Sequence, residues 1–330
     1  MIIATHDGSF HADETLACAI LTYLFENSNI IRSRDMKILE KADLIIDVSG
    51  KNDERHYDHH SNAFTLERSN GIRYATAGII WEKYGIEYLH KIYCNFVKAN
   101  IPLISDAIFK KAFLRIDREV MWMVDLNDNG QLNEFIDNSL GTLNEKEQSI
   151  VDNLNELYRL EPSIPYLVAM QNLPNISGQE QNKAFLNTVK ILKTLMQNIA
   201  INALHTEYGI DQVLHVYDGG PILIMHERLP WTNAFLANPE IFKDCYLAVY
   251  PDRKRGWRIQ SLPHSAAQRF KNRCSAPKAW RGLDFENLDK ATSLSNTIFV
   301  HKAGFTGGAM DFETNLEMAR LWLKHGEYLK

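Results

Sequence analysis

The apolar positions in the first third of the chain alternate between short strand-like runs and helical patterns. Residues 2–5 form a short β-type run, and residues 42–48 form a continuous apolar run closed by an acid, which is typical of a buried parallel strand. Residues 13–25 carry apolar positions at helical spacing and begin with two acids, where helix amides favour negative charge. Two further elements are predicted here, a strand over 29–34 and a helix over 74–84 that ends at Gly85. Strands alternating with helices predict an α/β domain with a parallel sheet.

The pattern changes twice in the rest of the chain. Residues 144–207 are mixed polar and apolar in a helical manner, interrupted by Pro162, Pro165 and Pro174, which predicts a helical connector. After Gly209 the sequence pattern is typical of β-strands, which are predicted over 213–218, 221–227, 245–252, 257–263 and 297–304. A closing helix is predicted over 315–324. We therefore predict two domains: an α/β domain with its helical connector over 1–205, and a smaller α+β domain over 206–330.

Composition supports a two-domain globular protein. The chain has 330 residues, of which 45% are apolar and 23% charged, and single cores stop growing near this length. We expect a cytoplasmic protein without membrane association, because there is neither a long apolar run nor a basic segment ahead of one. Four cysteines without a CxxC pair argue against a disulfide framework and a thiolate zinc site. The net charge of −5 does not decide the partner, since bound divalent cations would offset it.

Imidazole and carboxylate side chains are concentrated near the start of the chain. The stretch ATHDGSFHADETLA, residues 4–17, holds His6, His11 and Asp13, and five of the 12 histidines lie in the first 60 residues. His6 follows one predicted strand and Asp47 ends another. Because ligand sites of parallel sheets lie beyond the carboxyl ends of the strands, we expect both side chains to face one crevice.

These residues predict a metal centre. The candidate ligands are His6, His11, Asp13, Asp47, His59 and Asp128, with Asp125 as the alternative to Asp128. Mixed imidazole and carboxylate donors suit Mn²⁺, Fe²⁺, Zn²⁺ or Co²⁺ better than Ca²⁺. The set is large enough for two ions, which in phosphoryl transfer activate water and stabilise the leaving oxygen. Taken singly, Asp13 also suits a helix start and Asp47 a turn, so the prediction depends on the combination.

The motifs resemble a known family. The stretches ATHDGSFHADETLACAIL, DLIIDVSG, RHYDHHSNAF and MVDLNDNG, followed by LAVYPDRKRGWRIQSLP, KAWRGL and FVHKAGFTGGA, are similar in order to those of the MYG1 family (UPF0160-type) of the DHH phosphoesterase superfamily. The resemblance spans nearly the whole chain. It implies a two-domain, Mn²⁺-using phosphoesterase with its site between an α/β domain and a smaller C-terminal one, and it implies 3′–5′ exonuclease activity on RNA.

The resemblance also implies roles for individual residues. The first motif maps onto His6, His11 and Asp13, and the second onto Asp47. In the third motif, Asp58-His59-His60, His59 matches the metal ligand and His60 the group that faces the scissile phosphate, so Asp58, His59 and His60 are the expected catalytic residues. The fourth acid is placed at Asp128, with Asp125 next to it.

The C-terminal half supplies candidates for substrate binding. These are Arg258, Arg273, Arg281, His301, Lys302, Gly304, Gly307 and Gly308. Arginines beside Trp257 and Trp280 suit phosphate contacts combined with base stacking, and glycines let backbone amides approach a phosphate. The alternative interpretation is structural: tryptophans in the core covered by arginine, and glycines in a strand-to-helix turn.

We therefore predict a two-metal-ion hydrolase of phosphodiester bonds, namely a 3′–5′ exoribonuclease acting on RNA or short oligonucleotides. Two ions are expected, Mn²⁺ first, with Mg²⁺, Co²⁺ or Zn²⁺ as alternatives. A phosphatase or phosphodiesterase of small nucleotides and a non-catalytic, metal-stabilised RNA-binding protein remain as alternatives. The direction of degradation, RNA against DNA, and the oligomeric state are left open.

Overall fold

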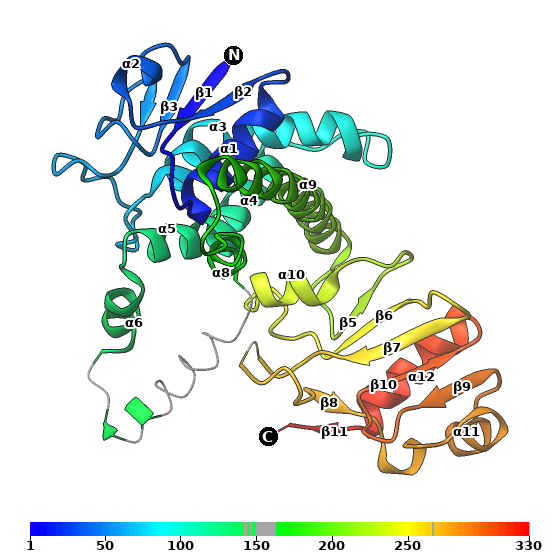
Figure 1. Cartoon of the computed structure of the whole chain (residues 1–330). Helices are drawn as coiled ribbons and strands as arrows, with labels where there is room; N and C mark the ends of the chain where they lie inside the picture. The colour runs from blue at the N-terminus through cyan, green and yellow to red at the C-terminus, as the bar shows by residue number, and fades with distance from the viewer. Residues whose placement is uncertain (142–143, 146, 150–162, 266, 330) are drawn as a thin grey trace. The chain divides into compact units, whose positions relative to one another are not determined.

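The computed structural model describes residues 1–141, 144–145, 147–149, 163–265 and 267–329 (Figure 1). The chain divides into two compact units, Met1–His205 and Thr206–Lys330. Helices and strands are mixed along it, and the first unit contains a parallel sheet, so the predicted α/β class is confirmed. Within the described residues, no helix is long and apolar enough to cross a membrane.

The sheet of the first unit has four strands in the order β2-β1-β3-β4, and every neighbouring pair is parallel. The strands are β1 (Ile2–Thr5), β2 (Asn29–Arg32), β3 (Leu44–Ile46) and β4 (His56–Tyr57). The predicted strands over 2–5, 29–34 and 42–48 are therefore confirmed, whereas β4 has no apolar run to reveal it. Burial of Ile3, Ile45 and Ile46 explains why the central strands read as apolar.

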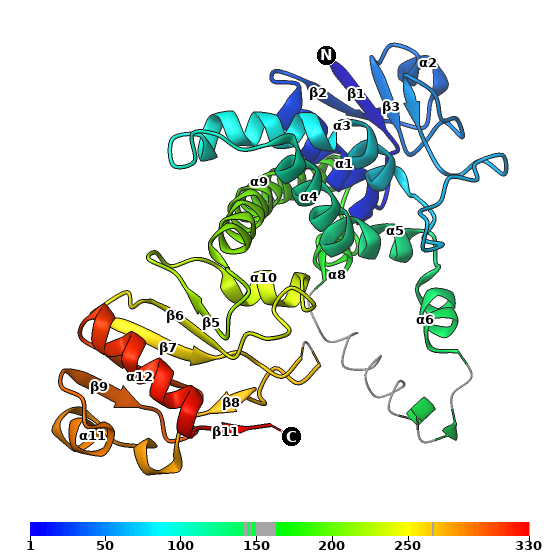
Figure 2. The same cartoon turned by 180° about the vertical axis from the view of Figure 1, so that it is seen from behind.

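Several α-helices begin in the first unit. They are α1 (Ala12–Leu24), α2 (Met36–Leu39), α3 (Thr76–Ile92), α4 (Asp106–Ile116), α5 (Trp122–Asp128), α6 (Leu132–Leu140), α8 (Ile164–Ala169) and α9 (Gly178–Val216). Two π-helical segments, Tyr93–Val97 and Asp117–Met121, follow α3 and α4. Helix α3 packs against α1, and α4 returns alongside α3 (Figure 2). On α2, Leu39 packs against Ala4 and Ile45 of the sheet.

Two details of the first unit differ from the predictions. Helix α3 does not end at Gly85 but continues to Ile92. A β-carbon at position 85 would lie 2.8 Å from the Phe113 ring and 2.9 Å from Trp81, so this glycine permits close packing of helices and does not end one. In the connector, Pro165 lies in the first turn of α8, where proline is tolerated. Pro162 falls outside the described residues.

The second unit contains a five-stranded sheet in the order β5-β6-β7-β10-β9. Its strands are β5 (Ile222–Ile224), β6 (Leu247–Pro251), β7 (Trp257–Ser261), β9 (Thr297–Val300) and β10 (Thr306–Ala309). Only β5 and β6 pair in parallel among these described strands. Helix α12 (Phe312–His325) packs against β6, β7 and β10, and α10 (Trp231–Ala237) belongs to a second hydrophobic core. The remaining elements are α11 (Phe285–Thr292), β8 (Cys274–Ser275) and β11 (Glu327–Tyr328).

The predictions for this unit are largely confirmed, with two corrections. The strand expected over 213–218 is wrong, because α9 runs to Val216 and buries Val213 completely. The glycine-rich segment is not a strand-to-helix turn at Gly307 and Gly308, which lie within β10 and pair with both neighbouring strands. Gly304 alone of these three occupies the turn before β10, with a left-handed φ of 69°.

Candidate metal centre

The carboxyl ends of the four parallel strands bring the candidate ligands together. His6 directly follows β1, Asp47 follows β3, and Asp58 and His59 follow β4. In a parallel sheet these ends share one edge, and ligand sites of α/β sheets form there. Short runs of sequence that lie far apart therefore supply side chains to one place.

His6 connects two of the candidate carboxylates. Its ring is buried, with Nε2 3.1 Å from Glu14 Oε1 and 3.5 Å from Asp47 Oδ2. Nδ1 lies 2.9 Å from the carbonyl oxygen of Asp7, which can only accept, so Nδ1 carries the proton of the neutral ring. Nε2 consequently faces the carboxylates, and in the neutral ring its lone pair would be directed at a cation held between them.

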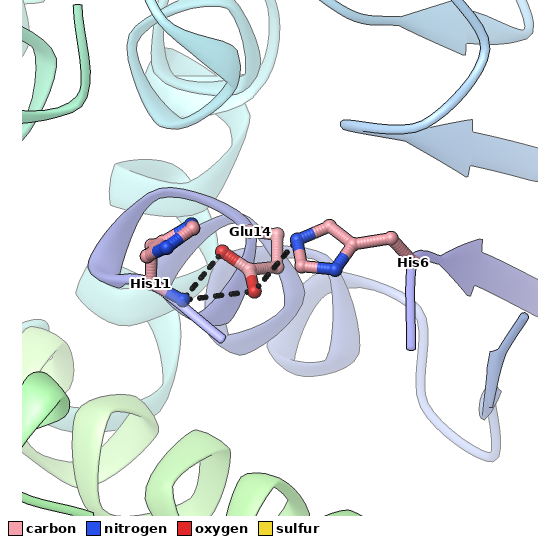
Figure 3. Close-up of side chains that lie close together, drawn as sticks. All are labelled: His6, His11 and Glu14. Atoms are coloured by element: carbon pink, nitrogen blue, oxygen red, sulfur yellow. Dashed lines mark hydrogen bonds and ion pairs between the residues drawn. The ribbon is translucent and has the colours of Figure 1, made fainter. Parts of the chain in front are cut away.

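Glu14 and His11 complete this end of the site (Figure 3). The Glu14 carboxylate accepts the His11 backbone N–H at 2.9 and 3.1 Å, and this contact fixes the start of α1. The imidazole of His11 is not used in that contact. Ligand atoms of His6, His11 and Glu14 all lie within 4.8 Å of one another, so the three side chains can share a cation.

Asp13 is held by the start of α3. Its carboxylate is fully buried and accepts the backbone N–H groups of Thr76 at 2.9 Å and Ala77 at 2.5 Å. These donors have no partner inside the helix, so a carboxylate at this position satisfies them and is itself fixed. Burial, together with the nearby charges of Asp128 and Asp47, raises the pKa of Asp13 well above its usual range.

Asp47 lies between two imidazoles. Its Oδ2 is 3.5 Å from His6 Nε2, and its Oδ1 is 3.5 Å from His59 Nε2. The backbone has a left-handed φ of 56°, which aspartate tolerates better than most residues, and the strained turn re-aims the side chain directly after β3. Burial opposes ionisation, but the neighbouring imidazoles of His59 and His6 outweigh it and lower the pKa of Asp47 to about 2. A carboxylate in this position can bridge two cations.

His59 provides the clearest test of a metal fit. Its Nε2 is buried without a hydrogen bond, although it lies 3.0 Å from Asp128 Oδ2 and 3.7 Å from Asp13 Oδ2. Nδ1 faces Asn129 Oδ1 at 3.1 Å, and the Asn129 amide nitrogen donates to the carbonyls of Arg73 and Asp125, which fixes the orientation of the amide. Nε2 therefore faces a group of carboxylates, and with the neutral ring this donor set fits a divalent cation.

The charges of the two buried imidazoles support the same conclusion. Burial alone would lower their pKa values, but neighbouring carboxylates outweigh it and raise the pKa of His6 to about 10 and that of His59 to about 11. The imidazoles thus carry protons that offset the buried carboxylates. A divalent cation would supply this positive charge in their place and release the protons.

His60 is placed differently from His59. Its side chain is 61% exposed, and Nδ1 lies 2.8 Å from Asp58 Oδ1 and 3.3 Å from Asp47 Oδ1. Asp58 is buried and also accepts the backbone N–H groups of His60 and Gly50. The structure therefore places Asp58 behind His60, where it orients the ring, and Asp58 is not among the residues grouped as metal ligands in the described chain.

The two acids of α5 have different surroundings. Asp128 is grouped with Asp13 and His59 as a set of metal donors. Asp125 is fully buried, and it accepts from Arg68 at 2.7 Å and from the Gly78 amide at 3.2 Å. Burial raises the pKa of Asp125 to about 7 against the opposing effect of Arg68. Among the described residues Asp125 joins no metal-binding group, so of these two acids Asp128 is the better candidate ligand.

Several residues of the site were not predicted from the sequence. Glu14 lies in the opening motif, but its position in the first turn of the predicted helix, where acids are favoured, gave a sufficient structural explanation. Asn129 is adjacent to Asp128, but nothing in NDNG distinguishes it from a turn residue. Thr76 and Arg68 act through contacts across the fold, and no local motif reveals them.

Most of the cations predicted to bind substrate already have partners inside the second unit. Arg258 pairs with Asp252 at 2.6 Å, and Arg281 pairs with Glu327 at 2.5 Å and donates to the Ala276 carbonyl. A β-carbon on Gly304 would lie 2.7 Å from Arg281 Nε, so this glycine makes room for the arginine.

Three further candidates of this unit are Arg273 and His301, which are half-buried, and Lys302, which is exposed. Arg273 donates to the backbone carbonyls of Phe242, Lys243 and Cys245. His301 Nδ1 accepts the Ala303 backbone N–H, while Lys302 is exposed. Substrate contact by all of these candidates stays a prediction, and Lys302 is the one whose exposure suits it best.

Comparison with known proteins identifies the family. Residues 2–323 match the model of the MYG1 exonuclease family, described as Uncharacterised protein family (UPF0160). A MYG1 protein of Caenorhabditis elegans is 30% identical over 99% of this chain and 96% of its own length, and one of Schizosaccharomyces pombe is 29% identical over 96% of each. The human MYG1 exonuclease is 28% identical over 99% of this chain and 87% of its own. DHH superfamily membership stays a prediction, but the family match spans nearly all of the sequence. The chain belongs to the MYG1 family.

Proposed function

We propose that this protein is a metal-dependent exonuclease that hydrolyses phosphodiester bonds, acting from the 3′ end on RNA or short oligonucleotides. The observation that carries the proposal is the convergence of His6, Asp47 and His59 with buried carboxylates at one edge of the sheet. The naming of the human and rat relatives as MYG1 exonucleases supports the same reaction class. Direction and RNA preference rest on the family resemblance.

The described side chains form three donor groups, of which one joins Asp47, His59 and His60, and these groups overlap enough to be served by two neighbouring ions. We assign one ion to His6, His11 and Asp47, with Glu14 as a further donor, and the other to Asp13, Asp47, His59 and Asp128. Asp47 is shared because its two oxygens face different imidazoles. Nitrogen and oxygen donors together favour Mn²⁺ among the ions that support hydrolysis of phosphate esters.

When bound, two such ions supply a water nucleophile near neutral pH and neutralise charge on the phosphoryl group. The residues of the chain provide the positioning. Asp58 holds His60 so that its Nε2 faces away from Asp58 and is available to a phosphoryl oxygen. The α3 amides hold Asp13, and Asn129 holds His59, so the ligands are arranged before substrate arrives.

The test uses the full-length protein with Mn²⁺ and single-stranded RNA labelled at its 5′ end. Stepwise shortening of the labelled strand is expected, and Asp13→Asn or His59→Ala should lower its rate at least about 100-fold, because loss of an outer-shell partner alone costs about 10- to 100-fold. Asp106→Asn, an exposed acid in the first turn of α4, is the matched control and should leave the rate unchanged.

Other outcomes would change the conclusion. Equal shortening by the Asp13→Asn variant and the unaltered protein would assign the activity to a contaminant. Hydrolysis that becomes faster as the substrate is shortened to a dinucleotide would favour a phosphodiesterase of small nucleotides. Binding of RNA with no product under any metal would contradict catalysis altogether.

A further inference from the structure

The second strand of the parallel sheet delivers a cation to the edge that holds the metal centre. β2 pairs with β1 up to Arg32, which lies opposite Thr5, and the next amide, that of Ser33, donates to the Thr5 carbonyl at 2.8 Å. Because the two strands are parallel and Thr5 lies opposite Arg32, the residue after Ser33 emerges beside Asp7, the residue that follows His6. Arg34 therefore lies at the same edge of the sheet as His6, the first candidate ligand in the sequence. It was not among the predicted site residues.

Arg32 and Arg34 serve this edge in different ways. Arg32 is committed to the fold: Nε donates to the His6 carbonyl at 3.1 Å, NH2 donates to the Gly8 carbonyl at 2.7 Å, and the guanidinium lies 4.3 Å from the centre of the Phe185 ring. It therefore holds the loop that carries His6. This half-buried guanidinium cannot turn to a ligand without releasing that loop.

Arg34 is available to a ligand. Within the part of the chain that the structure describes, its one ion pair is a 3.7 Å contact from Nε to Asp7 Oδ1, and the two side chains are 66% and 58% exposed. Exposed pairs of this length contribute little, so exchange of Asp7 for a stronger partner has a small cost. Asp7 is the neighbour of His6, and its carbonyl oxygen contacts the His6 ring. The guanidinium is accordingly held next to the ligand loop but outside the buried donor groups.

The charge of the edge indicates what Arg34 would bind. All members of the described metal-binding groups are acids or imidazoles, which bind cations. These groups supply no guanidinium or ammonium that could pair with the other phosphates of a longer substrate. A guanidinium matches two phosphate oxygens at once, and its exposure suits a ligand that arrives from solvent.

We propose that Arg34 binds a phosphate of the substrate strand next to the scissile one, and that this contact favours oligonucleotides over esters with a single phosphate. The inference rests on the proposed function, because it names the substrate class of that same site. Asp7 holds the side chain in place until the strand arrives.

The experiment compares Arg34→Gln and Arg34→Lys with the unaltered protein and with Arg118→Gln. Arg118 is a matched control in the same unit, 59% exposed and paired with Glu119 at 3.4 Å. A short single-stranded RNA and bis(4-nitrophenyl) phosphate, an ester with one phosphate, serve as substrates with Mn²⁺. Binding of the same RNA, labelled with fluorescein, is measured by anisotropy, and bound metal is measured in each variant.

Arg34→Gln should raise KM for the RNA and weaken its binding by about 10- to 100-fold, the range for loss of a charged hydrogen bond. The ratio of kcat/KM for RNA to that for the small ester should fall by a similar factor, with metal content retained. Arg34→Lys should recover part of the loss, because it keeps the charge but not the paired geometry. Arg118→Gln should bind RNA as the unaltered protein does.

Equal binding of RNA by Arg34→Gln and the unaltered protein would overturn the inference. So would an equal loss toward both substrates, or a loss of metal, since either would place Arg34 in support of the ion site. If the unaltered protein hydrolysed neither substrate, the proposed function would fail, while the anisotropy measurement would still decide whether Arg34 binds the strand.

Discussion

At the scale of single residues, the orientation of the imidazole rings defines the candidate centre. His6 and His59 each place Nδ1 against an oxygen that can only accept, the Asp7 carbonyl and the Asn129 amide oxygen. Both rings therefore direct Nε2 at carboxylates, where a divalent cation would take the place of the proton. The ring atom that faces a metal is set by the bond at the other nitrogen, so the partner of that nitrogen matters nearly as much as the ligand.

This reasoning makes Asn129 testable. Asn129→Ala removes the acceptor at His59 Nδ1 and frees the ring to turn, so Mn²⁺ affinity should fall by about 10- to 100-fold. Asn127→Ala, an exposed asparagine on the same helix, is the control. Isothermal titration calorimetry of each protein with Mn²⁺ checks the expectation, and an Asn129→Ala protein with undiminished affinity would refute it.

Asp125 and Asp128 of α5 should differ in function, the first supporting stability and the second metal binding. Asp128→Asn removes a proposed donor and should weaken Mn²⁺ binding, with little loss of stability. Asp125→Asn breaks a buried pair with Arg68, and uncompensated buried charge costs about 3–5 kcal/mol; because Arg68 keeps its bonds to Asp117, we expect about 3 kcal/mol. Urea unfolding and Mn²⁺ titration of both variants check this. A loss of metal from Asp125→Asn with unchanged unfolding would reverse the two roles.

The residues that the sequence could indicate are those with the chemistry of ligands. His6 and Asp47 follow predicted strands and Asp13 begins a predicted helix, so the argument from sheet topology reaches them. His59 follows β4, which no apolar run revealed, and it was predicted from its chemistry and from the resemblance of its motif. Their supporting partners are ordinary residues. Thr76 holds Asp13 through its backbone amide, a contact across 63 positions that no side-chain motif can reveal.

At the scale of elements, α3 supports the site with one end and the core with its middle. Its first amides bind the Asp13 carboxylate, and at Gly85 it passes close to the Phe113 ring of α4, beside its own Trp81 ring. Sequence reasoning treated this glycine as a helix end because glycine commonly occupies that position. Packing against a neighbouring helix overrides that preference, and only the tertiary structure shows the neighbour.

Gly85→Ala should consequently destabilise the protein, although alanine favours helix by about 1 kcal/mol over glycine. The added methyl group would meet two aromatic rings, and overpacking of this kind costs about 1–3 kcal/mol, so the net effect should be a loss of stability. The matched control is Gly178→Ala at the start of α9, where a β-carbon meets nothing within 4 Å. Urea midpoints that rise for both variants would contradict the packing argument.

At the scale of the whole molecule, the alternation of strands and helices predicted the parallel sheet, but not the extent of α9. The run that includes Val213 and Val216 has the composition of a strand, yet it lies at the end of a 39-residue helix. Val213 is fully buried there in the core of the second unit, so packing outweighs the β preference of valine. Local composition therefore gave the fold class but misassigned one element.

The candidate centre joins segments from separate elements, so its occupancy should affect the stability of the fold. Removal of metal leaves the buried carboxylates of Asp13 and Asp47 without a divalent partner, and ligand binding at 100 times Kd adds about 2.7 kcal/mol. We expect chelation to lower Tm and added Mn²⁺ to restore it in a concentration-dependent way, as measured by differential scanning calorimetry. Asp13→Asn should abolish the response and Asp106→Asn should keep it. If the Tm of the unaltered protein did not change with Mn²⁺ concentration, these side chains would converge for structural reasons alone.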